Sequence, residues 1–165
     1  MTRPPAVPSL PTAGRGVRMR RTVSADLDWV LAAESHPENR PFVTQWTRQG
    51  HEETLDHPDT RHLIVESVTD GRAVGYVILA GLAAAGQGVE LRRIVITDKG
   101  RGYGRETLRL IKKMALEDLR TRRLWLDVRT NNPRAKQLYE EEGFVVEGTA
   151  PDGLIILSIR REDET

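Results

Sequence analysis

The chain has 165 residues, 38% of them apolar and 30% charged, which suits one globular domain with a proper core. A formal net charge of +1 gives no support to a general nucleic-acid binder, and the lack of cysteine excludes disulfides, thiolate metal ligands and a cysteine nucleophile. No apolar run is long enough to cross a membrane and no signal-peptide core is present. We therefore expect a cytoplasmic protein with no nucleic-acid or membrane partner.

The first sixteen residues differ in composition from the rest. They carry four prolines and almost no bulky apolar side chains, so they cannot bury enough surface to offset the entropy of ordering. We predict a flexible Pro-rich tail over 1–16 and a single domain over 17–165. The domain opens with a predicted strand, Val17–Val23, followed by a helix that Ser24 caps and that carries Leu27, Val30 and Leu31 at helical spacing.

The segment His36–Asp59 is the least periodic and predicts one or two short helices. With Glu34 it holds six acids against two arginines, which either form an acidic rim suited to a cationic amine or are ordinary solvated side chains. His51 is interpreted as part of a solvated helix start, and Trp46 either packs or lines an acceptor pocket. The four histidines, His36, His51, His57 and His62, show no recurrent ligand spacing, so we expect no metal.

The second half of the chain alternates strands and helices. Asp70-Gly71 between two β-rich runs predicts a hairpin. Gly143 is suited to ending the short helix before it. The order of elements predicts a mixed sheet flanked by helices. The predicted strands are His62–Val68, Ala73–Leu82, Val89–Ile96, Arg123–Val128, Phe144–Gly148 and Leu154–Ile159, and the predicted helices are Gly102–Leu119 and Asn132–Glu142.

The turn between Ile96 and the following helix reads KGRGYGR over residues 99–105. It fits neither the Rossmann fingerprint, because Arg105 stands where the third glycine belongs, nor a phosphate-binding loop of the Gly-Lys-Ser/Thr type. A strand that enters a helix through glycines aims free backbone N–H groups and the positive end of the helix dipole at one point. Lys99, Arg101 and Arg105 add positive charge. The turn therefore predicts a site for a phosphate-bearing anion.

At these residues the chain resembles the GNAT superfamily of acetyl-CoA-dependent N-acetyltransferases. The family's pyrophosphate motif, Arg/Gln-x-x-Gly-x-Gly/Ala, is matched by Lys99-x-x-Gly102-x-Gly104, with lysine in the first place. A second family motif, N-x-x-A-x-x-L-Y-x-x-x-G-F, is matched from Asn132 through Ala135 and Tyr139 to Phe144. The sequence that follows is similar to the branch with ribosomal-protein Nα-acetyltransferases and polyamine acetyltransferases. The resemblance implies an α+β (mixed α/β) fold with a mostly antiparallel sheet of about seven strands and about four helices.

The resemblance also assigns roles. The backbone of Ile94 and Ile96 would pair with the pantetheine arm of acetyl-CoA, and Asn132 would bind its amides besides capping a helix. Cofactor contacts would also come from Ala135 and from the turn, residues Lys99, Gly100, Arg101, Gly102, Tyr103, Gly104 and Arg105. The cofactor would be acetyl-CoA as co-substrate, with an amine as acceptor.

Two residues would carry the chemistry. Glu90 is placed as some family members place a glutamate that acts as base through water, and the alternative is a surface glutamate paired with Arg92 or Arg93. It shares one strand face with Arg92, Ile94 and Ile96 if the strand is regular, whereas a bulge near Arg93 would alter this facing. Tyr139 would donate a proton to the coenzyme A thiolate, or would simply pack beside Phe144. An N-acetyltransferase and a non-catalytic acyl-CoA-binding module both remain open, as does a homodimer.

Overall fold

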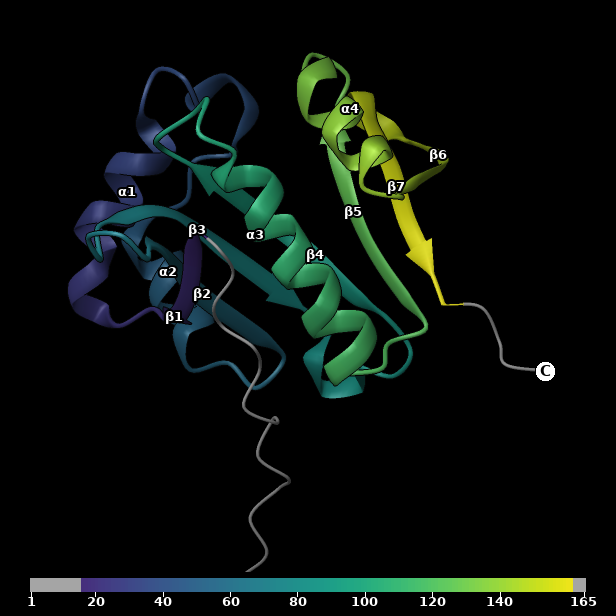
Figure 1. The fold of residues 1–165 in the computed structure, drawn as a ribbon, viewed down its shortest axis with the longest axis horizontal. Helices are drawn as coiled ribbons and strands as arrows, with labels where there is room; N and C mark the ends of the chain where they lie inside the picture. The colour runs from purple at the N-terminus through teal and green to yellow at the C-terminus, as the bar shows by residue number, and fades with distance from the viewer. Residues whose placement is uncertain (1–15, 162–165) are drawn as a thin grey trace, which may run out of the picture.

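The first four strands pair with their neighbours in sequence, all antiparallel. A computed structural model describes residues 16–161 and places these strands in one sheet of seven, in the order β1-β2-β3-β4-β5-β7-β6 (Figure 1). The seven strands are β1 Val17–Arg21, β2 Thr60–Ser67, β3 Ala73–Ala80, β4 Val89–Ile96, β5 Arg123–Arg129, β6 Val145–Ala150 and β7 Leu154–Arg160. The predicted mixed, mostly antiparallel fold is therefore confirmed.

The hairpin between β2 and β3 has the predicted turn. The Asp70 carboxylate accepts a hydrogen bond from the Arg72 N–H at 3.0 Å, and Gly71 takes a φ of +73°, a region in which glycine is favoured. The N–H of Gly16, the first described residue, donates to the Glu106 carboxylate at 2.5 Å, and its carbonyl accepts from the Val68 N–H. The rest of the predicted tail, 1–15, lies outside the described residues.

Helices cover both faces of the sheet (Figure 1). The helix α3, Tyr103–Lys112, buries Leu108 and Ile111 against one face, and a π-helical turn, Lys113–Asp118, extends it. On the other face, α1, Leu27–Ser35, packs Leu27 and Val30 against the sheet. The remaining α-helices are α2, Arg48–Leu55, and α4, Pro133–Glu141.

Alternation along the strands divides the apolar core into two clusters. On β2, Leu63 and Val65 join the cluster on the α3 side, whereas Ile64 joins the cluster on the α1 side, as a period of two requires. Among residues 16–161, no helix is long and apolar enough to cross a membrane. The same described residues contain no group of three or more His, Cys, Asp or Glu side chains able to hold a metal ion.

Candidate active site

The sheet opens between β4 and β5. These parallel strands pair only at Val89–Leu124 and Glu90–Trp125, whereas β4 continues to pair with β3 as far as Ile96. The backbone from Leu91 to Ile96 therefore has a strand neighbour on one side only, and an extended molecule can bind along the other. Ile94 and Ile96, the predicted contacts for pantetheine, lie in this segment.

The glycine turn lies where β4 ends and α3 begins. Gly100 and Gly102 take φ values of +84° and +79°, and a Cβ on either would meet no atom within 4 Å. Gly102 is the N-cap of α3 and accepts from the Glu106 N–H, so the N–H groups of Tyr103, Gly104 and Arg105 have no partner within the helix. The turn thus has the open space and the free donors that an anion needs.

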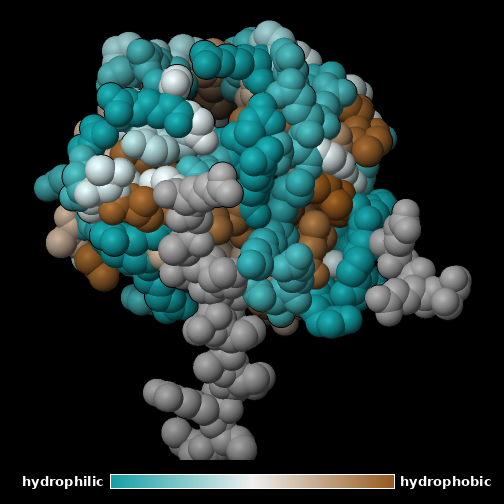
Figure 2. Space-filling view, viewed as in Figure 1, coloured by the Kyte–Doolittle hydropathy of each residue, from teal (hydrophilic) through white to brown (hydrophobic). Residues whose placement is uncertain are grey.

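The surface agrees with this arrangement. Viewed from the α3 side, the outer face of α3 forms a hydrophilic stripe, and a hollow with an apolar floor opens near its upper end (Figure 2). In Figure 1, α3 and α4 border the opening between β4 and β5, and the end of this opening beside the start of α3 is called its mouth.

The three cations of the turn are held by protein partners. Lys99 donates to the Glu38 carbonyl at 3.1 Å, and Arg101 lies 3.3 Å from the Asp98 carboxylate. Arg105 reaches across to α4, where it binds Glu141 and Glu142, each at 2.6 Å. The sequence suggested free positive charge for phosphate oxygens, whereas in the structure the backbone N–H groups are the donors without partners.

Glu142 joins α3 to the end of α4. Its side chain is buried and binds Arg105, Arg109 at 2.9 Å and, more distantly, Lys112 at 3.9 Å. Lys112 also donates to the Glu142 carbonyl. These cations hold the pKa of Glu142 below its usual value. The ion pairs fix the spacing of the two helices that border the mouth.

A β-bulge changes the facing of β4. Ile78 on β3 pairs with Arg93 and the next residue, Leu79, pairs with Leu91, so Arg92 is the extra residue. Leu91 belongs to the core on the α3 side, as does Ile94. Of the two possibilities that the sequence left open, the strand is the irregular one, so Glu90 does not share a face with Ile94 and Ile96 and faces the α1 side.

Glu90 is half-buried at the point where the strands separate. Burial is the main cause that raises its pKa, the negative charge of Asp127 raises it further, and the Arg92 guanidinium, 3.1 Å away, opposes both. Asp127 lies two residues beyond Trp125, the β5 partner of Glu90, and partial desolvation raises its pKa too. Asp127 was not predicted from the sequence as a site residue. The period of two along β5 could have indicated it, because it places Asp127 on the same face of the sheet as Glu90.

Tyr139 approaches the same opening from the other face. It lies on α4, packs in the core on the α3 side, and its ring centroid is 5.9 Å from that of Phe144. Burial, with a smaller contribution from the charge of Asp127, raises the pKa of Tyr139 to about 12. The phenol is therefore protonated at neutral pH, and no hydrogen bond to a described residue contributes to its pKa.

Asn132 caps α4, as predicted. Its Oδ1 accepts from the Ala135 N–H at 3.3 Å, and Pro133 occupies the first helical position. Ala135 packs against the core on the α3 side. The cap uses the oxygen of the Asn132 amide and leaves its two N–H donors for another partner.

A buried polar network lies beneath α1 and α2. Glu34, for which the sequence left open an acidic rim or an ordinary solvated acid, is 1% exposed, so neither alternative holds. His51 is 0% exposed, so the prediction of a solvated side chain is wrong. The Glu34 carboxylate binds His51 Nε2, the Trp46 N–H at 2.9 Å and Arg93 at 3.3 Å. Helical spacing could have indicated the burial of Glu34, because this residue lies four positions after Val30 and seven after Leu27, on the buried face of α1.

The network continues from His51 to β1. His51 Nδ1 lies 3.1 Å from His62 Nε2, and His62 Nδ1 lies 2.7 Å from the Thr22 hydroxyl. Burial, with nearby positive charge, lowers the pKa of His62 to about 3, so this ring is neutral at pH 7. Trp46, whose role the sequence left open, contacts His51 and stacks under the Arg93 guanidinium, 4.4 Å from the ring centroid.

We expect Glu34→Ala to lower the free energy of unfolding by about 3–5 kcal/mol, because removing one member of a buried ion pair leaves the others unpaired. Urea unfolding followed by fluorescence measures the effect. Glu38→Ala is the matched control: its side chain is exposed, so a change within about 0.5 kcal/mol is expected. Equal losses in the two variants would contradict a structural role for the network.

This chain is similar to known proteins in its sequence pattern and in its fold. The sequence pattern of the acetyltransferase (GNAT) family matches residues 28–144. A search of curated proteins finds no match. Among solved structures, a domain from Methanocaldococcus jannaschii is 20% identical with a TM-score of 0.75, covering 88% of this chain and 98% of that one. Spermidine N-acetyltransferase from Vibrio cholerae, solved with CoA and spermine, is 19% identical with a TM-score of 0.76, covering 87% and 95%.

Proposed function

Because the chain belongs to the GNAT family of acetyltransferases, whose members use acetyl-CoA as co-substrate, we propose that it transfers an acetyl group directly from acetyl-CoA to a primary amine. The observation that supports the proposal is that a glutamate and a tyrosine, each able to exchange a proton, lie on opposite faces of one opening in the sheet. Glu90 faces the α1 side and Tyr139 the α3 side, where β4 and β5 separate.

The cofactor would bind from the α3 side. The N–H groups at the start of α3 would hold the pyrophosphate, with Gly100 and Gly102 leaving room for it. The pantetheine arm would pair with the unpaired backbone of β4 at Ile94 and Ile96, and the Asn132 amide would donate to it. The acyl group would then reach the opening below the Tyr139 hydroxyl.

The reaction would proceed by direct attack. The neutral amine forms a bond to the thioester carbonyl carbon, its proton passes to Glu90 through water, and the carbon–sulfur bond breaks. The departing thiolate takes a proton from Tyr139. A raised pKa suits Glu90 to this role, because a carboxylate closer to neutral pH is a stronger base.

The acceptor would be a small cationic amine or a protein N-terminus. Glu90 and Asp127 place two carboxylates on the acceptor side, which attracts an ammonium group. The spermidine N-acetyltransferase similar in fold acts on such a cation. The acids of α1 and α2 contribute less than the sequence suggested, since Glu34 is buried and Asp59 accepts from the N–H groups of Gly81 and Ala83.

The alternative is a module that binds acyl-CoA without turning it over. Release of free coenzyme A thiol from acetyl-CoA, measured against a panel of polyamines, aminoglycosides and peptides with free N-termini, separates the two. An enzyme releases thiol in proportion to acetylated amine, which mass spectrometry identifies. Tight binding of acetyl-CoA with no thiol release above the hydrolysis rate across the panel would favour the module.

We expect Glu90→Gln to lower turnover chiefly at the acidic end of the pH profile. There the amine is mostly protonated and needs a base, so the loss shrinks as the pH approaches the pKa of the amine. The pH–rate profile on any accepted amine measures this, with Glu117→Gln, an exposed glutamate outside the opening, as control. A uniform loss at every pH would instead assign Glu90 a role in holding the amine.

A further inference from the structure

A second cavity lies away from the candidate active site. It has a volume of about 240 Å³ and is lined by residues of β1, the start of β2 and the loop between α2 and β2. None of the proposed cofactor-binding or catalytic residues lines it. The glycine turn follows the end of β4, whereas this cavity lies beside Thr60, at the other end of the strands. Thr60 pairs with Ala80, the partner of Glu90, but Arg61 shares the α3 face with Leu63, whereas Glu90 faces the α1 side.

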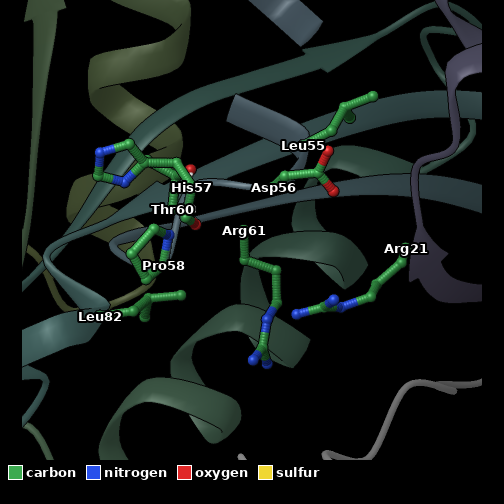
Figure 3. Close-up of a pocket in the computed structure, with 8 residues that line it drawn as sticks. All are labelled: Arg21, Leu55, Asp56, His57, Pro58, Thr60, Arg61 and Leu82. Carbon is green, nitrogen blue, oxygen red and sulfur yellow. Dashed lines mark hydrogen bonds between the residues drawn. The ribbon is translucent and has the colours of Figure 1, made fainter. Parts of the chain in front are cut away.

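Two arginines dominate this cavity. Arg21 on β1 pairs with Leu63 on β2, and Arg61 lies two residues before Leu63, so the two arginines are diagonal neighbours on the same face of the sheet. Figure 3 shows the Arg21 side chain extending toward that of Arg61, whereas the His57 ring turns the other way. Leu55, Pro58 and Leu82 supply apolar walls.

Neither guanidinium has a partner among the residues that the structure describes. Among residues 16–161, no hydrogen bond or ion pair involves the side chain of Arg21 or Arg61, although Arg18 and Arg20 of the same strand both bind Glu66. The Nε of Arg61 is buried without an acceptor, an arrangement that is costly unless something binds there. Burial and the charge of Arg21 lower the pKa of Arg61. Asp56 is the single acid among the lining residues.

We propose that this cavity binds the phosphate group of a small anion. Guanidinium groups bind phosphate oxygens through paired N–H donors, and a dianion balances two like charges better than a carboxylate does. A bound phosphate would supply the acceptor that Arg61 Nε lacks. The volume is below the range of about 300–1,000 Å³ for drug-sized ligands, so the ligand is inorganic phosphate or a small phosphate monoester rather than a nucleotide.

Calorimetric titration of the full chain tests the proposal. Inorganic phosphate, glycerol 3-phosphate and acetate are compared at equal ionic strength, because screening alone changes the apparent affinity. We expect either phosphate compound to bind at least about tenfold more tightly than acetate. Tighter binding of the monoester identifies a phosphorylated metabolite as the ligand, and tighter binding of phosphate identifies the free ion. Equal binding of all three, or none, would overturn the proposal.

Variants locate the site. Arg61→Gln and Arg21→Gln should each weaken phosphate binding by about ten- to a hundredfold, whereas Arg18→Gln, on the same strand but paired with Glu66, should not. Gly102→Glu separates this site from the glycine turn and should keep the phosphate affinity. Loss in Gly102→Glu together with retention in Arg61→Gln would place the phosphate at the turn instead. If Arg61→Gln fails to fold, the phosphate affinity of Arg21→Gln tests the site instead, because Arg21 is exposed.

Discussion

Turnover of the Tyr139→Phe variant is expected to fall by about 10²–10⁴-fold, the usual contribution of a general acid. The substitution removes one hydroxyl and keeps the ring that packs beside Phe144, so stability and coenzyme affinity should change little. Because burial holds the pKa of Tyr139 at about 12, the phenol stays protonated in any ordinary assay. The wild-type rate should therefore show no loss from tyrosine ionisation up to about pH 10.

The matched control is Tyr76→Phe. This tyrosine is also fully buried, but its hydroxyl contacts Arg93 at 3.4 Å, in the core on the α1 side. Its removal should affect stability and leave thiolate protonation intact. Steady-state turnover with any accepted amine compares the variants. Full activity of Tyr139→Phe would leave solvent as the proton source and assign the tyrosine a packing role.

The Gly102→Glu variant is expected to lose coenzyme A binding, as measured by calorimetry. A glutamate there would put a negative charge beside the N–H groups at the start of α3, where the pyrophosphate is proposed to bind. The φ of +79° also adds backbone strain for any residue with a Cβ. The fold should persist, because nothing lies within 4 Å of the added Cβ.

Two controls separate charge from strain. Gly102→Ala carries the strain without the charge and should keep most of the affinity. Gly86→Glu carries the charge at an open turn outside the proposed site and should leave the affinity unchanged. If calorimetry gave the wild-type affinity for Gly102→Glu, the pyrophosphate could not bind at this turn.

The sequence was sufficient to predict those features that depend on residues adjacent along the chain. Asp70-Gly71 specified the hairpin turn, since both its side-chain acceptor and its positive φ are local requirements. Asn132 and Pro133 specified the start of α4 for the same reason. The strand–turn–helix around Gly102 was predicted in place because its glycines and the following helical spacing are contiguous.

Contacts between distant segments could not be predicted in this way. His51 lies on a short polar helix and is buried only because Glu34, His62 and Tyr76 surround it from three other elements. The bulge at Arg92 depends on its pairing with β3. The sequence predicted Arg105 as a phosphate contact, whereas in the structure it pairs with Glu141 and Glu142 at the end of α4. Each case depends on tertiary neighbours, which override local propensity.

The short pairing between β4 and β5 has a consequence for folding kinetics. Strands β1 to β4 pair in sequence order, and β5, β7 and β6 form a second set joined by the β6–β7 hairpin. Among the described strands, the parallel pairs Val89–Leu124 and Glu90–Trp125 are the only backbone pairing between the two sets, across a crossover that includes all of α3. Contacts of long sequence separation form slowly because the loop must close first. We expect each set to form before the two join, so that the opening between them is completed last.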